Sequence, residues 1–297
     1  MTLRQRSHLS PSIADALMAL GLLLVILLCL YPFWYIIIRS FNDSNDLAMG
    51  GVFLWPRVFS LESYRIVFKI GLINPFFISC ARVAAGVVSS VFISAMLAFV
   101  LSHKDLIGRK FFSTFFISTM YFSAGLIPNY LLIMSLRLMN TFWVYILPGL
   151  VGVYNMILLR VYFEGLPISL EESATLDGAS ELRVFLQIIL PLSLPIIAAV
   201  SIFVGVGQWN SWQDAYLYNT NQESLWPLQL VLMNILNEST AIKIKTAADV
   251  AAGTKVKISS QSIQLAITAV TTIPIIIIYP FFQKYFISGV MLGAVKE

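Results

Sequence analysis

Long stretches without charged residues recur along this chain, and they constrain its fold more than any other feature. A membrane-spanning helix needs about 20 predominantly apolar residues, because the hydrocarbon core of a bilayer is about 30 Å thick. Such stretches cover about residues 14–38, 75–102, 111–136, 138–160, 188–212 and 259–283, with one interruption by Arg82. They predict an all-α membrane protein with six transmembrane helices, forming a single domain over residues 1–297.

The overall composition agrees with a chain that faces lipid. Only 11% of the residues are charged and 58% are apolar, whereas soluble proteins carry about 25% charged residues. The net charge of +4 gives no reason to expect a nucleic-acid partner. Cys29 and Cys80 both lie in apolar stretches, so they predict neither a disulfide framework nor a metal site. The lipid bilayer is therefore the first expected partner.

The distribution of Lys and Arg predicts the orientation. With the amino terminus inside, nine basic residues fall on each side, so a raw count does not decide. Short segments near the ends of spans carry most weight, and five of the inner nine lie in the two segments before the first and after the second stretch. We therefore predict that both termini and the loop 164–190 are cytoplasmic, with outer loops at 39–74 and 213–257.

The loop 164–190 reads EESATLDG over 171–178 and IILP over 188–191. Two starts compete for a short helix here: Pro167 as the first helical residue, or Ser169 as a cap that forms a capping box with Glu172. Gly178 is expected to end this helix, and a second helix is expected to begin near Ser180. From the spacing alone, a docking element and an ordinary solvated helix are equally good interpretations.

This loop resembles the EAA loop of bacterial ABC import permeases, with Ser173 in place of the first Ala. Three further segments, 51–56, 159–167 and 286–296, are similar to the carbohydrate-uptake branch of that family. Within this branch, the chain looks most like the second, shorter permease subunit of an alginate-type importer. The resemblance covers essentially the whole chain and implies the ABC type I importer permease fold.

The resemblance also implies the partners and the function. It implies a heterodimer with a second homologous permease, two ATP-binding cassette subunits and an extracytoplasmic sugar-binding protein, all at the bacterial cytoplasmic (inner) membrane. ATP and magnesium would bind the partner ATPase, so this chain is expected to carry no cofactor, metal or catalytic residue. The loop over 169–180 would couple to the ATPase through Glu171, Glu172, Ser173, Ala174, Asp177 and Gly178.

Two features of the sequence separate this function from its rivals. The chain has no phosphate-binding loop of the Gly-x-x-x-x-Gly-Lys type, so it is not expected to hydrolyse ATP. No Asp or Glu lies in the core of a predicted span, whereas a secondary transporter usually buries carboxylates for ion coupling. The expected function is a permease for oligosaccharides or polysaccharide fragments. The alternatives are a permease for another small solute in the same importer class, and a secondary transporter.

Polar and aromatic residues inside the spans are candidates for a sugar pathway, because intramembrane polar groups usually face a cavity or a bundle interior. The candidates are Trp209, Asn210, Trp212 and Gln213, with Tyr154 and Asn155 as a second group. The alternative for the tryptophans is an aromatic belt at the membrane surface. Arg82 is expected either to snorkel outward or to face a cavity as the cation for an anionic sugar such as a uronate.

The last outer loop, 213–257, contains a group of basic residues and an apolar stretch. Its basic residues are expected either to attract an anionic sugar or simply to be solvated; they are Lys243, Lys245, Lys255 and Lys257. The apolar stretch 225–236 is expected to be helical, and it would lie on the membrane or dock the binding protein.

Overall fold

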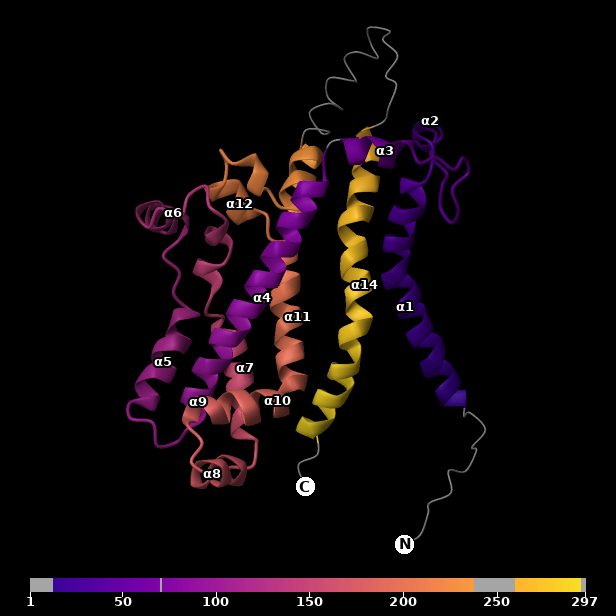
Figure 1. Ribbon diagram of the computed structural model, residues 1–297. Coiled ribbons are helices and arrows are strands. Elements are labelled where there is room, and N and C mark those ends of the chain that lie inside the picture. Colours follow the sequence, from indigo (N-terminus) through magenta and orange to yellow (C-terminus); the bar gives the residue numbers. More distant parts are fainter. Residues whose placement is uncertain (1–12, 70, 238–259, 295–297) are drawn as a thin grey trace. The chain divides into compact units, whose positions relative to one another are not determined.

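The computed structural model describes residues 13–69, 71–237 and 260–294. Apart from one isolated bridge between Asn42 and Phe59, these residues form helices and connecting loops (Figure 1). The all-α prediction is therefore confirmed for the described part of the chain. The four lysines of the last outer loop, the residues at the two ends of the chain and the start of the sixth predicted span lie outside the described residues.

The described residues fall into two compact units. One unit takes its members from 1–69 and 239–270, and the other from 70–238 and 271–297. Helix α14 (Ser260–Ala294) contributes residues to both units. In α1 (Ile13–Ser40), 0% of the residues in the apolar window are buried.

The first unit contains α1, α2 (Ser44–Ala48) and α3 (Glu62–Lys69). The Asp43 side chain caps α2 by accepting the backbone N–H of Asn45 at 2.9 Å. The Asn42 amide donates to Asp46 at 2.8 Å, and this bond, together with the ion pair to Arg57, holds the pKa of Asp46 below its ordinary value. The segment after α1 is therefore an ordered turn rather than a simple solvated connection.

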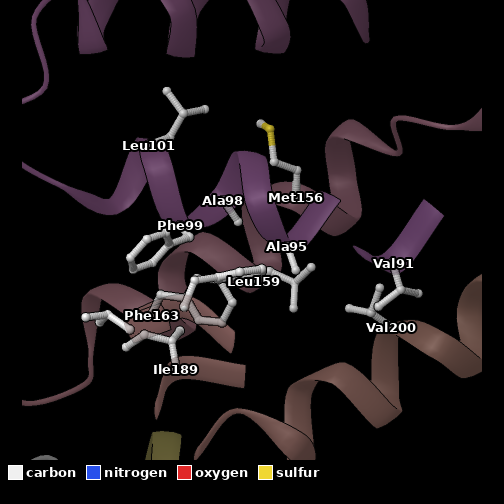
Figure 2. Close-up of a cluster of buried hydrophobic side chains, with 12 residues drawn as sticks. Val91, Ala95, Ala98, Phe99, Leu101, Met156, Leu159, Phe163, Ile189 and Val200 are labelled. Atoms are coloured by element: carbon white, nitrogen blue, oxygen red, sulfur yellow. The ribbon is translucent and has the colours of Figure 1, made fainter. Parts of the chain in front are cut away.

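The second unit is built around α4 (Ile73–Ser102), which packs along α7 (Val153–Glu164) and α11 (Leu194–Asn210). Small residues on α4, among them Ala95 and Ala98, are fully buried at this contact. Small side chains let helix backbones approach closely where lipid gives no hydrophobic drive to association. Figure 2 shows the resulting core, in which Leu159 of α7 meets the α4 side chains.

Shorter elements complete the second unit. They are α5 (Arg109–Thr119), α6 (Leu126–Ser135), η1 (Phe142–Tyr145), η2 (Leu147–Gly149), α8 (Ser169–Leu176), α9 (Glu181–Val184), η3 (Phe185–Ile189), α10 (Leu190–Leu192), α12 (Gln213–Tyr218) and η4 (Glu223–Leu225). A further apolar helix covers Leu228–Asn237, as expected for the stretch 225–236.

The predicted count of six spans is not confirmed among the described residues. Three helices are long and apolar enough to cross a membrane, namely Asp15–Ser40, Ile73–Ser102 and Gln261–Ile278. Two bent pairs, Phe142–Gly149 with Val153–Glu164 and Glu181–Leu192 with Leu194–Asn210, raise the number to five if each pair is one span. The bends are 50° and 83°.

The third predicted span, 111–136, is two helices instead of one. Helix α5 ends at Thr119 and α6 begins at Leu126. Between them Gly125 adopts φ +84° and ψ 178°, a conformation that is essentially restricted to glycine. In the fifth predicted span, 188–212, Pro195 follows the 83° bend at the start of α11, where its missing N–H is tolerated.

Candidate functional site

The predicted coupling helix is α8, and it begins differently from both predicted starts. The helix starts at Ser169 after Ile168, and no side chain caps it. Ser169 is already inside the first turn, since the N–H of Glu172 donates to the Ile168 carbonyl at 3.1 Å. The capping box with Glu172 is therefore not formed, and Pro167 precedes the helix instead of opening it.

The end of α8 at Gly178 is confirmed. Gly178 adopts φ +82°, the left-handed conformation that glycine takes without a steric penalty. Its N–H donates to the Thr175 carbonyl at 3.0 Å, and the Ala179 N–H donates to the Ala174 carbonyl at 2.9 Å. These two bonds form a Schellman motif, which satisfies the last carbonyls of the helix and reverses the chain. The second helix follows with Ser180 as its N-cap, as expected.

The motif gives α8 two distinct faces. Ala174 and Ala179 pack inward against the buried core that contains Phe163 and Phe185. Glu172 and Asp177 are exposed, and Leu176 between them is 89% exposed. Glu172 and Leu176 are four residues apart and so lie on one side of the helix. An acidic face with an apolar tip is thus presented away from the core.

Glu171 lies on the inner side, although the sequence placed it with Glu172 among the coupling residues. Its carboxylate is 3.2 Å from the Nε2 atom of His103 at the end of α4. A second group of charges joins α5 and α7, where Glu164 accepts from both Arg109 and Arg160. Sequence reasoning missed these pairs, and only the spacing of four residues between Arg160 and Glu164 gave a local signal.

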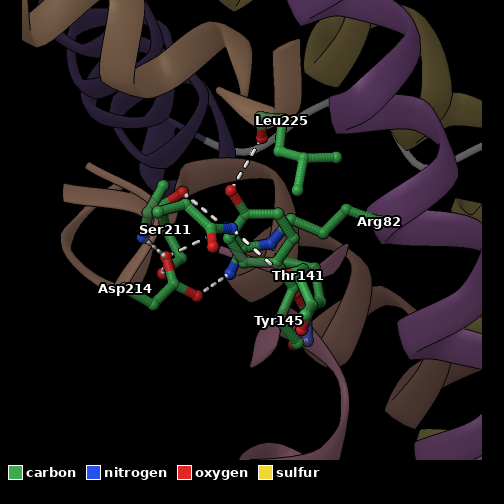
Figure 3. A network of polar contacts seen from close by, with 9 residues as sticks. Arg82, Thr141, Tyr145, Ser211, Asp214 and Leu225 are labelled. Carbon is green, nitrogen blue, oxygen red and sulfur yellow. Dashed lines mark hydrogen bonds and ion pairs between the residues drawn. The ribbon is translucent and has the colours of Figure 1, made fainter. Parts of the chain in front are cut away.

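Arg82 neither snorkels outward nor faces a cavity, in contrast to both sequence expectations. The residue is 2% exposed and forms an ion pair with Asp214 at the start of α12. Its Nε atom donates to Gln208 at 2.7 Å, and its guanidinium carbon lies 4.5 Å from the centroid of the Tyr145 ring. Figure 3 shows this polar network between α4 and the segments around Asp214 and Tyr145.

The Asp214 carboxylate is fully engaged in the same network. It accepts from the Ser211 hydroxyl at 3.1 Å and from the Ala215 backbone N–H at 2.8 Å, besides Arg82. Burying a cation inside a membrane protein is costly unless it is paired and hydrogen-bonded. The network therefore explains how Arg82 is accommodated in an apolar helix, and it fixes the break between α11 and α12.

The other pathway candidates separate into buried and exposed groups. Trp209 is buried and donates its indole N–H to the Thr271 carbonyl at 3.1 Å, so it is a packing residue. Trp212 is partly buried and stands edge-on to Tyr216. Asn210 and Gln213 are exposed. They retain polar groups free to meet a solute.

Tyr154 and Asn155 occupy the first turn of α7. Tyr154 is 58% exposed, whereas Asn155 is half-buried beside Gly152. Only Tyr154 of this pair therefore presents its side chain openly. Among the described residues, no group of three or more His, Cys, Asp or Glu is placed to hold a metal ion.

A substitution at Gly86 tests the Arg82 network through the free energy of unfolding. A Cβ at this position would lie 2.9 Å from the Cγ atom of Gln208, whose amide is held by Arg82 and by the Tyr145 carbonyl. Gln208 cannot move aside without losing these bonds. We expect Gly86→Ala to lower the free energy of unfolding by about 1–3 kcal/mol, the cost of overpacking.

The matched control is Gly207→Ala on α11, because nothing lies within 4 Å of a Cβ there. In a helix, alanine is favoured over glycine by about 0.5–1 kcal/mol, so this control should not be destabilised. The measurement is thermal unfolding of the purified chain in detergent. Equal midpoints for the two variants would show that Gln208 does not depend on the space at Gly86.

The comparisons with known proteins come from curated sequences and solved structures, since no family model matches the chain. The chain is 38% identical over 276 residues to the polygalacturonan/rhamnogalacturonan transport system permease protein YtcP of Bacillus subtilis, covering 93% of this chain and 95% of that protein. It is 30% identical to the arabinooligosaccharides transport system permease protein AraQ of Halalkalibacterium halodurans, covering 94% and 96%. A crystal structure of a bacterial ABC transporter involved in the import of the acidic polysaccharide alginate matches with a TM-score of 0.80 and 30% identity, over 96% of this chain and 100% of that chain.

Proposed function

The chain belongs to the family of sugar permeases of ABC importers, and from this premise we propose that it forms half of the translocation pathway of an ATP-driven importer. The other half comes from a second, homologous permease subunit. Two ATP-binding cassette subunits bind ATP and magnesium, and an extracytoplasmic sugar-binding protein delivers the cargo. This chain is a transport permease, and the hydrolysis of ATP belongs to its partners.

The shape of α8 is the observation that best supports the coupling role. A short, rigid helix with one packed face and one free face suits insertion into the groove of a partner. The free face carries Glu172, Leu176 and Asp177, so it offers two carboxylates around an apolar tip. A groove with basic residues around an apolar pocket would complement it. Ser173 is exposed beside Glu172 and allows close approach to such a groove.

The orientation follows from the same role. We place α8 and both termini in the cytoplasm, and the segments 39–74 and 213–257 outside the cytoplasmic (inner) membrane of a bacterium. The end of α4 that carries His103 is then cytoplasmic, and the Arg82 network lies toward the outer side. The helix Leu228–Asn237 would lie on that outer side, where the binding protein docks.

The proposed cargo is an oligosaccharide or a polysaccharide fragment, including acidic ones such as pieces of alginate. Relatives named as permeases for polygalacturonan/rhamnogalacturonan and for arabinooligosaccharides support this class, as does the alginate importer among the solved structures. The test is uptake by the complete complex in vesicles, with neutral and acidic oligosaccharides offered in turn. Uptake of another small solute, with none of any sugar, would retain the importer class and reject the cargo.

Asn210 and Gln213 provide a test of the pathway. We expect Asn210→Leu and Gln213→Leu each to lower sugar uptake severalfold, because each removes a hydrogen bond to the sugar worth about 0.5–1.5 kcal/mol net. Both residues are exposed, so assembly should be retained. The measurement is uptake per assembled complex. Unchanged uptake in both variants would leave Asn210 and Gln213 as interfacial residues.

A further inference from the structure

His103 ends α4 and makes contacts with both of its ring nitrogens. The Nδ1 atom lies 2.9 Å from the carbonyl oxygen of Phe99, one turn earlier in α4. The Nε2 atom lies 3.2 Å from the Glu171 carboxylate in α8 and 3.9 Å from the Glu181 carboxylate in α9. The Phe99 ring stands edge-on to the imidazole, with 4.7 Å between the centroids. The imidazole is thereby held between α4 and α8.

The groups that face the two ring nitrogens are both acceptors. A carbonyl oxygen and a carboxylate oxygen accept hydrogen bonds and donate none. The imidazole therefore meets an acceptor of α4 on one side and a carboxylate of α8 on the other.

The charged groups around His103 come from several elements. Glu171 faces it from α8 and Glu181 from α9. Arg109 of α5 is directed elsewhere, since it donates to the Leu101 carbonyl at 2.9 Å and pairs with Glu164. Lys104 and Asp105 follow His103 in the chain as one charge of each sign. Two carboxylates therefore face the ring from the helices packed against it.

We infer that His103 is the positioning residue that joins the coupling helix α8 to α4, and that Glu171 is its internal partner rather than a contact for the ATPase. The geometry distinguishes two adjacent glutamates: Glu171 points to α4, while Glu172 is exposed on the free face. Because α4 packs along α7 and α11, a displacement of α8 reaches the core of this unit through the His103–Glu171 contact. This inference rests on the proposed coupling role of α8.

The test uses the complete complex of both permeases, the ATPase subunits and the binding protein. Two readouts are taken: the amount of ATPase that co-purifies, and the ratio of sugar-stimulated to basal ATP hydrolysis. We expect His103→Ala and Glu171→Ala to lower the ratio about fivefold or more, the lower range of couplings between sites, with co-purification retained. The double variant should lose no more than either single variant, since both remove one contact.

Glu172→Ala is the matched control, one residue away in the same first turn of α8. It should lower co-purification of the ATPase, which His103→Ala should not. His103→Arg places several N–H donors at this position opposite the Glu171 carboxylate, so it should recover the ratio.

Three results would overturn the inference: a normal ratio in both alanine variants, losses that add in the double variant, or a loss of co-purified ATPase in Glu171→Ala equal to that in Glu172→Ala. If His103→Ala reduces the yield of folded chain, Glu171→Ala on the exposed helix decides instead. A wild-type complex that binds no ATPase, or that shows no stimulation by sugar, would contradict the proposed function itself and is distinguishable from these outcomes.

Discussion

Gly178→Val is expected to release or uncouple the ATPase subunits while the chain stays in the membrane. Gly178 holds φ +82°, and an ordinary L-residue pays about 1–2 kcal/mol in this conformation. A β-branched side chain is disfavoured further. The Schellman bonds from Gly178 and Ala179 would be lost, so α8 would no longer be held at a fixed angle to its core. The free face with Glu172 would then be misplaced for docking.

The control is Gly178→Asn, because asparagine tolerates the left-handed conformation far better than valine. Apart from the two adjacent residues, no atom of the described part of the chain lies within 4 Å of a Cβ at this position, so both variants test backbone conformation without crowding. The measurements are co-purification of the ATPase and sugar-stimulated ATP hydrolysis. Gly178→Val should abolish most of the co-purification and most of the stimulated hydrolysis, whereas Gly178→Asn should retain most of each.

Glu172→Lys reverses a charge on the free face, so it should lower both readouts as Gly178→Val does. Wild-type values for Gly178→Val and Glu172→Lys together would remove α8 from the coupling role.

Asp214→Ala is expected to cost about 3–5 kcal/mol of unfolding free energy. It leaves Arg82, which is 2% exposed, without its counter-ion, and removing one partner of a buried pair has an effect of this size. The Asp214 side chain is itself 23% exposed, so the lower end of the range is expected. Arg82→Gln should also be destabilising. Glutamine cannot reproduce the paired contact with the carboxylate.

The double variant Arg82→Leu with Asp214→Leu distinguishes the contribution of the charges from that of side-chain volume. Replacing both members by apolar residues leaves no unpaired charge, so its cost should be smaller than that of Asp214→Ala. Gln213→Ala, at the exposed neighbour, should change stability by no more than about 0.5 kcal/mol. Thermal unfolding in detergent measures all three. A double variant at least as unstable as Asp214→Ala would show that the network contributes more than charge neutralisation.

The long helices could be predicted from the sequence because their signal is local. The apolar stretches 14–38 and 75–102 correspond closely to α1 (Ile13–Ser40) and α4 (Ile73–Ser102). The breaks are hidden inside equally apolar stretches, because hydropathy does not report backbone conformation. Gly125 interrupts 111–136 through a positive φ that the amino-acid composition does not reveal.

The candidate site was predictable to a similar extent. The end of α8 at Gly178 could be predicted because glycine adopts a positive φ without a steric penalty. The structure has Gly178 in this conformation. The partners of Arg82 and His103 are not visible in the sequence, because Asp214 and Glu171 come beside them only through packing. From the sequence, Arg82 was expected to be a cation without a partner, and Glu171 and Glu172 were expected to have the same role. In the structure Arg82 pairs with Asp214, and Glu171 faces His103 while Glu172 is exposed.

The most direct test of the account is ATP-dependent uptake by a reconstituted complex. The chain, a second homologous permease, the ATPase subunits and the sugar-binding protein are placed in vesicles, and accumulation of labelled acidic and neutral oligosaccharides is followed. We predict accumulation that requires ATP, the binding protein and all subunits, with no ATP hydrolysis by the purified chain alone. Accumulation driven by an ion gradient without ATP, or ATP hydrolysis by this chain without partners, would contradict the account.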